Sequence, residues 1–310
     1  MRILVVGAGA TGGYFGAMLA RAGQDVTFLV RAGRAAALRE RGLRVVGRDE
    51  EWRIQAELVT APELAAAPAP YDLVLLSVKA TALAAALDDL APAVGPDTVI
   101  LPQLNGLAHL DVLNARFGPA RVLAGVAKVV TTLDDTTGDI LRLAPLAQLE
   151  FGEQDGVESA RVRELRGIFT GAGIDARVPE HAVTAMWHKW AFITAFGAVT
   201  SLTRGTVGEA NAVPGGTELA TALLDESAAV ARAAGHPLSE AERGASLGVL
   251  TAPGSPMVPS LYRDLVAGRP TEVEHLFGDL VDRARGLGVP TPLMDLVTLQ
   301  LRVAQARAAA

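Results

Sequence analysis

The stretch that decides the fold is residues 1–23, MRILVVGAGATGGYFGAMLARAG, an apolar run that leads through closely spaced glycines into a segment of small residues. Residues 2–7 are typical of a buried strand, and residues 11–22 predict a helix. The string between them matches G-x-G-x-x-G and consists of Gly7, Ala8, Gly9, Ala10, Thr11 and Gly12. In a strand–loop–helix context the three glycines permit a tight turn, a close approach of pyrophosphate to the backbone, and close packing of helix on strand. We therefore predict a dinucleotide-binding loop rather than a plain glycine turn, with the phosphates on the free N–H groups at the start of the helix.

The end of the second predicted strand indicates which dinucleotide is bound. NAD enzymes usually carry an acid about 20 residues after the glycines, where it holds the ribose 2′-hydroxyl. Here Arg31 follows the strand at 26–30, and Arg34 comes one helical turn later. An acid would repel a 2′-phosphate, whereas a guanidinium binds one through two parallel hydrogen bonds. We predict NADP as the cofactor and Arg31 as a ligand of its 2′-phosphate; an ordinary surface arginine is the alternative.

Strands and helices alternate through the first half of the chain, which is typical of a parallel sheet covered by helices on both faces. Further strands are expected at 71–78 and 98–101, and helices at 32–41, 81–90 and 107–117. Residues 43–60 are expected to form paired strands. Residues 122–153 predict more strands with a turn at Asp134–Gly138, followed by a helix at 157–172 and a short strand at 174–178.

The pattern changes at Pro179, beyond which almost every segment has helical period and length. Glycine and proline clusters at 214–216, 235–237, 253–256 and Pro290 separate the expected helices. The predicted fold class is α/β, with an N-terminal Rossmann-type parallel sheet followed by an all-helical domain. We expect an NADP-binding domain at 1–178 and a helical domain for substrate and dimerisation at 179–310.

Composition excludes several classes of function. The 310 residues carry a net charge of −6 with no basic cluster, so neither nucleic acid nor an anionic membrane surface is an expected partner. No cysteine is present, and the five histidines lack ligand spacing, so no metal site is expected. No apolar stretch resembles a signal peptide or a membrane span. We expect a soluble, cytoplasmic protein.

Lysine is rare in this chain, which otherwise uses arginine as its basic residue. Only Lys79, Lys128 and Lys189 are lysines among 28 basic residues. Arginine cannot give up a proton in proteins, whereas a lysine with a lowered pKa can. Each lysine is therefore a candidate for chemistry.

Three short patches lie where a substrate could reach a nicotinamide. Ser77-Val78-Lys79-Ala80 and Leu104-Asn105-Gly106 follow predicted strands, and Trp187-His188-Lys189-Trp190 lies in the first helix of the second domain. With the glycine loop, and with Ser260-x-x-x-Asp264 and Gly268-Arg269-Pro270-Thr271-Glu272, these strings resemble the ketopantoate reductase (2-dehydropantoate 2-reductase) family over nearly the whole length.

The resemblance implies a role for each patch. It implies that Lys189 is the general acid that protonates the forming alkoxide, and that Lys79 and Asn105 bind the cofactor, with Asn105 also close to the substrate. It further implies that Glu272 lies where cofactor and substrate meet and that Ser260 holds the substrate carboxylate. It matches Lys128 to no motif, which favours a structural role for that residue.

Plainer interpretations of the same residues stay open. Lys189 could be a lysine that packs its stem on apolar neighbours and keeps its amine in water. Glu272 follows a proline, and in the first turn of a helix an acid is favoured by the dipole alone. Ser260 could be a helix N-cap.

The chain departs from the family at the substrate. The family's lysine helix carries asparagines that hold the polar ends of ketopantoate, and the matching positions here are Ile193, Gly197 and, further along the chain, Val207. Residues four apart share a helix face, so Lys189, Ile193 and Gly197 should line one surface that has lost its amides. An apolar wall would penalise a buried, unpaired hydroxyl by roughly 1–3 kcal/mol. This predicts an NADPH-dependent reductase of a 2-oxo acid with a less polar pocket.

Other functions remain in view. Ketopantoate itself is one substrate, and a related ketone is another. A phosphosugar or glycerol phosphate dehydrogenase would need a basic cluster in the second domain, where the arginines are scattered. An NADP-binding sensor without turnover would tolerate the loss of the amides but would not need Lys189. The resemblance also implies a homodimer.

Overall fold

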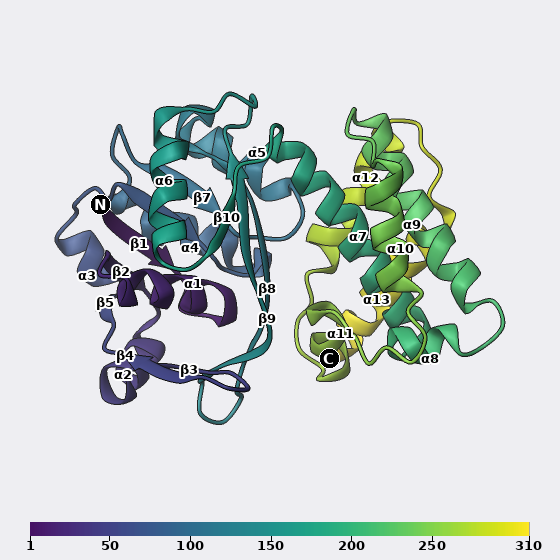
Figure 1. Cartoon of the computed structure of the whole chain (residues 1–310), viewed down its shortest axis with the longest axis horizontal. Helices are drawn as coiled ribbons and strands as arrows, with labels where there is room; N and C mark the ends of the chain where they lie inside the picture. Colours follow the sequence, from purple (N-terminus) through teal and green to yellow (C-terminus); the bar gives the residue numbers. More distant parts are fainter. Residues whose placement is uncertain (310) are drawn as a thin grey trace. The chain divides into compact units, whose positions relative to one another are not determined.

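The computed structural model describes residues 1–309, and the chain divides into two compact units. The first comprises Met1–Leu104 and His109–Ala185; the second comprises Asn105–Ala108 and the chain from Met186 onward. The fold class is the predicted one, a Rossmann-type parallel sheet in the first unit and helices alone in the described part of the second (Figure 1). The segment Asn105–Ala108 groups with the helical unit, although the predicted first domain ran to residue 178.

The parallel sheet of the first unit has the strand order β5-β2-β1-β6-β7. Its strands are β1 (Arg2–Val6), β2 (Asp25–Leu29), β5 (Glu57–Val59), β6 (Leu73–Leu76) and β7 (Val99–Pro102). The helices in this part of the chain are α1 (Ala10–Arg21), α2 (Ala32–Arg41), α3 (Ala61–Ala66), α4 (Leu83–Leu90) and α5 (Ala108–Phe117), with short 3₁₀ turns η1 (Ala80–Ala82), η2 (Ala91–Ala93) and η3 (Pro119–Arg121). All residues of β6 and β7 are buried, as expected for central strands covered on both faces.

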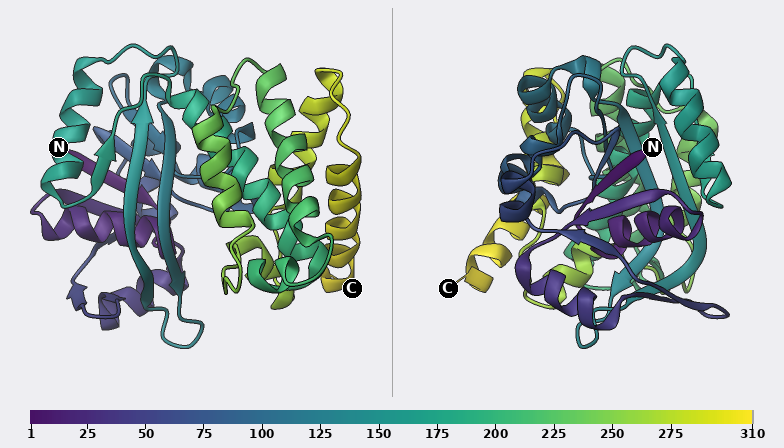
Figure 2. Two further views of the ribbon diagram at one scale, coloured as in Figure 1. Left: turned by 45° about the vertical axis from the view of Figure 1, so that its right-hand side comes forward. Right: turned by 90° about the vertical axis from the view of Figure 1, so that its left-hand side faces the viewer.

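A second, mixed sheet completes the first unit. Its strands are β3 (Leu43–Val46), β4 (Glu51–Ile54), β8 (Ala124–Leu133), β9 (Ile140–Gly152) and β10 (Asp175–Arg177), and helix α6 (Ala160–Gly171) precedes β10. Strands β8 and β9 form a long antiparallel ribbon, visible in the left view of Figure 2, with a register shift between Val129 and Thr131. Helix α1 contacts strands of both sheets. This explains why all residues from Gly12 to Ala17 are buried, and why all of them except Tyr14 and Phe15 are small.

The structure corrects the expected paired strands at 43–60. Residues 43–54 do form an antiparallel pair, β3 with β4, but β5 pairs in parallel with β2 in the other sheet. The remaining differences lie at element ends. The predicted strand at 71–78 spans 73–76, the predicted helix at 81–90 begins as the 3₁₀ turn η1, and the predicted helix at 157–172 spans 160–171.

The second unit consists of helices separated near the predicted glycine and proline breaks. They are α7 (Ala182–Thr203), which begins in the first unit, α8 (Val207–Asn211), α9 (Gly216–Ala233), α10 (Glu240–Leu250), α11 (Ser260–Val266), the π-helical segment η4 (Glu274–Gly278), α12 (Asp279–Gly286) and α13 (Pro292–Ala309). None of the helices within residues 1–309 is long and apolar enough to cross a membrane.

Candidate active site

The predicted nucleotide-binding residues of the first unit lie after strands that end at one edge of the parallel sheet. Strand order reverses at β1, because β2 and β5 lie on one side of it and β6 and β7 on the other. The chain leaves β1 at Gly7 and β6 at Ser77, and these strand ends are neighbours, with Val6 paired to Leu76. In open α/β sheets ligands bind outside the carboxyl ends of the strands at such a reversal.

The glycines of the loop meet three different environments. Gly7 has a φ of 98°, and a Cβ there would lie 2.8 Å from the Ser77 carbonyl oxygen. A Cβ at Gly12 would collide with the Gly7 carbonyl and lie 2.6 Å from Ser77 Cβ. A Cβ at Gly9 would meet no atom within 4 Å. Gly7 and Gly12 are therefore required by the fold, whereas the space beside Gly9 is open to a ligand.

Helix α1 begins at this loop without a side-chain cap. Gly9 is its N-cap residue, no side chain bonds to the first-turn amides, and the first turn holds no acidic residue. The first N–H groups of a helix have no partner within the helix, and the dipole makes this end positive. The loop thus offers the donors that a pyrophosphate needs, and the open space at Gly9 fits that group.

The two arginines after β2 differ in their surroundings. Arg31 is exposed at the N-cap of α2 and caps no amide of that helix. Arg34 is half-buried, and its Nη2 donates to the carbonyl oxygens of Ala8, at 3.2 Å, and Gly138, at 3.0 Å. Burial, and secondarily the charge of Arg41, lowers the pKa of Arg34. Arg31 is therefore the arginine whose guanidinium lies in solvent at this edge.

Lys79 lies at the same edge, just after β6. It is exposed and is the residue before η1, with its carbonyl accepting the N–H of Ala82 at 2.9 Å. The first unit thus brings together the glycine loop, Arg31 and Lys79.

Lys189 lies in α7 between residues that are firmly held. Trp190 is fully buried and donates from Nε1 to the Leu276 carbonyl at 3.0 Å. His188 bonds to Glu242 at 2.7 Å and to the Pro237 carbonyl at 3.0 Å. Lys189 itself is only partly exposed. The backbone that carries this amine therefore has little freedom to move.

Asn105 is held against the same helical segment as Trp190. His275 Nε2 donates to the Asn105 carbonyl at 2.6 Å. The following residue, Gly106, has a φ of 77° and approaches so closely that a Cβ there would lie 3.1 Å from the His275 carbonyl oxygen. His275 belongs to η4, and single π-helical turns are frequent at functional sites. The second unit thus places Asn105 and the Lys189 region of α7 on neighbouring residues of η4.

Glu272 lies just before the helical run that begins at Val273 and continues into η4, so it is not in the first turn of that run. Its side chain is partly buried and its carbonyl accepts the N–H of Leu276 at 2.9 Å. The preceding turn is fixed by the ion pair of Arg269 with the largely buried Asp264, at 2.9 Å. The motif residues Asp264 and Arg269 therefore hold the turn that delivers Glu272.

Ser260 does not cap a helix. It is exposed, it is the first residue of α11, and the N-cap position belongs to Pro259. The N-cap interpretation of Ser260 is therefore wrong. Val207 is fully buried at the start of α8, so it presents no side chain to solvent.

The face of α7 that carries Lys189 becomes apolar and then closed along the helix. Ile193 is partly exposed, whereas Gly197 is buried. A Cβ at Gly197 would lie 3.2 Å from Phe277 Cζ and 3.6 Å from Leu261 Cδ2. The room that an asparagine would need at position 197 is filled by these two apolar side chains.

The remaining lysine, Lys128, forms an ion pair in the second sheet. Lys128 pairs with Glu150 at 2.5 Å across β8 and β9, in line with its expected structural role. Within residues 1–309, no group of three or more metal-ligating side chains lies together. Sequence reasoning missed His275 and the role of Arg34, because both depend on partners more than 100 residues away.

Comparisons with known proteins cover both halves of the chain. A family model described as "Ketopantoate reductase PanE/ApbA" matches residues 3–156, and its C-terminal counterpart matches residues 182–305. The chain is 33% identical over 306 residues to the uncharacterized oxidoreductase YkpB of Bacillus subtilis, covering 99% of each chain.

Solved structures share the fold over the full length. The crystal structure of 2-dehydropantoate 2-reductase from Geobacter metallireducens matches with a TM-score of 0.89 and 29% identity, covering 98% of this chain and 100% of that one. A D-mandelate dehydrogenase in a ternary structure with NADH matches with a TM-score of 0.90 and 22% identity, covering 100% of both chains, which shows the shared fold alone.

Proposed function

We propose that this chain, which belongs to the ketopantoate reductase family of oxidoreductases, reduces a 2-oxo acid to the 2-hydroxy acid with NADPH and favours a less polar substrate than ketopantoate. The class of reaction is inferred from membership of this family. The substrate is inferred from the residues of α7, because the relative from Geobacter metallireducens acts on 2-dehydropantoate whereas the Bacillus subtilis relative is uncharacterized.

The proposed cofactor is NADPH, and the glycine loop, Arg31 and Lys79 of the first unit are its main proposed ligands. The uncapped start of α1 and the open space at Gly9 support a pyrophosphate on the loop Gly7–Gly12. The exposed guanidinium of Arg31 supports a 2′-phosphate at the end of β2. Asn105 and Glu272 are proposed as further cofactor ligands. When bound, the reduced nicotinamide supplies the hydride.

Lys189 is the proposed general acid. As charge grows on the substrate oxygen, an ammonium within hydrogen-bond reach stabilises it and then donates the proton from Nζ. Its fixed neighbours His188 and Trp190 support this role, since a catalytic amine gains from a backbone that does not move. Asn105 and Ser260 are proposed to bind the polar end of the substrate.

The observation that carries the substrate proposal is the packing around Gly197. Phe277 and Leu261 fill the room that an amide would need, and Ile193 offers only methyl and methylene groups one turn closer to Lys189. A hydroxyl buried against such a wall without a partner costs roughly 1–3 kcal/mol. An apolar 2-oxo acid avoids that cost. Ketopantoate remains the alternative substrate, with its hydroxyl bound by other groups.

Steady-state oxidation of NADPH by purified protein tests the proposal. The substrates are ketopantoate and a panel of apolar 2-oxo acids, and kcat/KM is compared across them. Turnover of an apolar acid above ketopantoate supports the proposal. NADPH binding without turnover of any acid would instead favour a sensor.

We further propose that the chain forms a homodimer through α13. Residues 292, 296, 299, 303 and 306 are exposed and recur at intervals of four and three, which is the seam of a coiled coil. Leu296 and Leu299 are each 60% exposed and Val303 is 43% exposed. Asp295 and Arg302 are already paired within the chain, with Arg285 at 2.8 Å and Glu274 at 2.6 Å, so apolar contact along the seam carries the proposed pairing of two copies. A second copy of this chain is therefore the proposed occupant.

A further inference from the structure

Arg34 does not lie in solvent as a ligand for phosphate would; it connects two backbone segments. One is the glycine loop, through the Ala8 carbonyl, and the other is the turn between β8 and β9, through the Gly138 carbonyl. Gly138 has a φ of 70°, and a Cβ there would lie 2.6 Å from Arg34 Nη1. The guanidinium therefore lies directly against the turn, and the positive φ of Gly138 favours glycine at that position.

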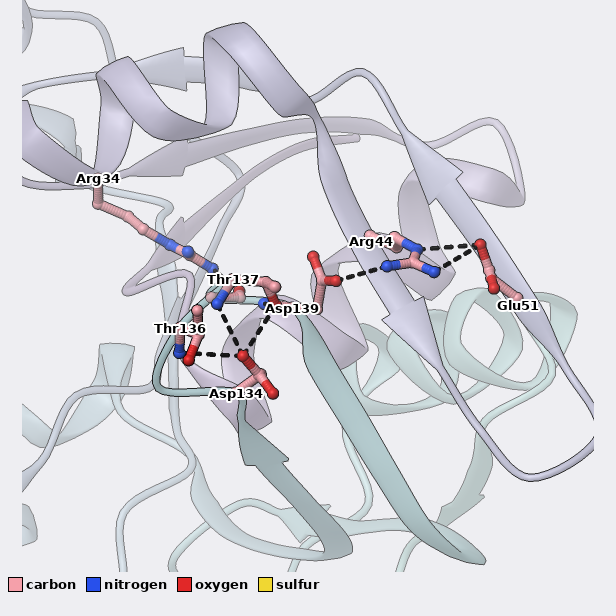
Figure 3. Close-up of polar contacts among 8 residues, drawn as sticks. Arg34, Arg44, Glu51, Asp134, Thr136, Thr137 and Asp139 are labelled. Carbon is pink, nitrogen blue, oxygen red and sulfur yellow. Dashed lines mark hydrogen bonds and ion pairs between the residues drawn. The ribbon is translucent and has the colours of Figure 1, made fainter.

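The turn that receives Arg34 is itself well anchored (Figure 3). The Asp134 carboxylate accepts the backbone N–H groups of Thr136, at 3.0 Å, and Thr137, at 2.7 Å, and it also accepts the Thr137 hydroxyl. These bonds lower the pKa of Asp134, led by that from the Thr137 backbone. At the other end of the turn, Asp139 pairs with Arg44 at 2.7 Å. Arg34 therefore ties the glycine loop to a rigid support.

A second bond joins the same ribbon to the start of α1. Thr131 lies just after the register shift in β8, is 8% exposed, and donates its hydroxyl to the Ala10 carbonyl at 3.1 Å. The glycine loop and the first turn of α1 are thus held from outside at Ala8 and at Ala10.

The Ala8 bond has a consequence for the loop's donors. In a planar trans peptide the carbonyl and the next N–H point in opposite directions. When Arg34 holds the Ala8 carbonyl toward the β8–β9 turn, the Gly9 N–H is directed the other way. Gly9 is the N-cap of α1, and its side without a Cβ faces open space. The orientation of this donor is therefore under the control of Arg34.

We infer that Arg34 is a positioning residue for the pyrophosphate-binding loop and does not read the cofactor's 2′-phosphate, which is left to Arg31. The inference rests on the proposed function, since it presupposes a nicotinamide dinucleotide on this loop. It departs from the simplest interpretation of two arginines one helical turn apart, in which both would bind the phosphate.

Binding of NADPH and NADH to the full chain distinguishes the two roles, because both carry the pyrophosphate and only NADPH carries the 2′-phosphate. Kd values are measured by fluorescence titration for the wild type, Arg34→Ala, Arg34→Lys and Arg31→Ala. We expect Arg34→Ala to raise both Kd values by the same factor, roughly tenfold, and to leave their ratio unchanged. Arg34→Lys should do the same, because it keeps the charge but its amine ends one bond short of the position of Nη2, from which Arg34 donates to both carbonyls. Arg31→Ala should weaken NADPH alone.

Thr131→Val provides a neutral variant in case loss of Arg34 impairs folding. It should also raise both Kd values equally, by a smaller factor, with no change of charge near the cofactor. A selective loss of NADPH in Arg34→Ala, or unchanged Kd values in all of the Arg34 and Thr131 variants, would overturn the inference while leaving the proposed function intact. A wild type that binds neither dinucleotide would overturn both.

Discussion

At the residue scale, the difference between lysine and arginine gives the sharpest test of the catalytic proposal. Lys189 is the only lysine in the described part of the second unit, where the other basic residues apart from histidine are arginines. We expect Lys189→Ala to lower kcat by about 10²–10⁴, the usual contribution of a general acid, while the Kd for NADPH changes little.

Lys189→Arg is the matched control for charge. It keeps a cation at the same position on α7, but a guanidinium does not release a proton in proteins. If Lys189 acts as an acid, this variant is nearly as inactive as Lys189→Ala in steady-state assays. An arginine variant with near-wild-type kcat would mean that charge alone suffices at this position.

The residue scale also shows where sequence reasoning reached its limit in the site. The places of Gly7–Gly12, Arg31 and Lys79 at the sheet edge could be predicted, because each of them follows closely on the end of a strand. The role of Arg34 could not, because its partner Gly138 is 104 residues away. Likewise, no residue near Gly197 in the sequence indicates that Phe277 fills the space beside it. Residues that act through distant packing leave no short-range pattern.

At the scale of elements, the loop between β1 and α1 contains one glycine that the fold requires, Gly12, and one that we expect cofactor binding to require, Gly9. Gly12→Ala forces a Cβ against the Gly7 carbonyl and Ser77, both in rigid segments, so we expect a marked loss of thermal stability. Gly9→Ala places its Cβ in open space, so the Tm without cofactor should stay within a degree or two, roughly the scale of a surface substitution. Its Kd for NADPH should nevertheless rise, because the methyl occupies the approach to the backbone.

Melting curves with and without NADPH measure both effects for the two variants. The wild type and Gly9→Ala should share one Tm in the absence of cofactor and differ in its presence. If Gly9→Ala binds NADPH as the wild type does, the phosphates do not lie on this loop.

The start of α10 gives a prediction with a pH dependence. Ser239 caps the helix in a reciprocal pair with Glu242, and Glu242 also receives His188 from α7. Burial alone would raise the pKa of Glu242, but the bonds from Ser239 and the nearby His188 outweigh it and hold the pKa below its usual value. We expect Ser239→Ala to cost about 1 kcal/mol near neutral pH.

The direction of this pH dependence follows from the lowered pKa of Glu242 in the folded state. The contribution of Glu242 is complete above its unfolded pKa of about 4.3 and is lost as the pH falls through the lower folded value. The Tm difference between wild type and Ser239→Ala should therefore be constant from pH 7 to about 5.5 and shrink below about pH 4. A difference that grows on acidification would contradict this account of the cap.

The elements also show which parts of the fold a sequence pattern can predict. Strands β6 and β7 are continuous apolar runs, β1 is apolar after Arg2, and the glycine and proline breaks of the second unit can be read directly from the sequence. Strand β5 has only three residues, and it pairs with β2, which lies further away in the sequence than β4 does. The π-helical turn at Glu274–Gly278 is likewise not predicted by any local sequence pattern. It places His275 within hydrogen-bond distance of the Asn105 carbonyl.

At the scale of the whole molecule, the proposed dimer depends on the exposed seam of α13. Leu299 lies at its centre and contributes apolar area that would otherwise face water. We expect Leu299→Glu to convert a dimer into a monomer, which analytical ultracentrifugation measures. Its Tm at low protein concentration should stay unchanged in a melting curve. Leu287→Glu is the control, since Leu287 is also exposed but lies outside the seam. A wild type that stays monomeric at high concentration would rule out the dimer.

The central claim concerns the substrate, and a pair of substrates that differ by one hydroxyl tests it most directly. Ketopantoate and 3,3-dimethyl-2-oxobutanoate share the oxo acid and the branched carbon, and only ketopantoate carries the hydroxyl. The measurement is the ratio of their kcat/KM values with NADPH, for the wild type and for Ile193→Asn, which restores an amide one turn after Lys189. The account predicts a wild type that favours the compound without the hydroxyl, and a ratio that shifts toward ketopantoate by roughly 2–10-fold in Ile193→Asn, the worth of one net hydrogen bond. A wild type that strongly prefers ketopantoate would contradict the apolar pocket and make this chain a 2-dehydropantoate reductase in the strict sense.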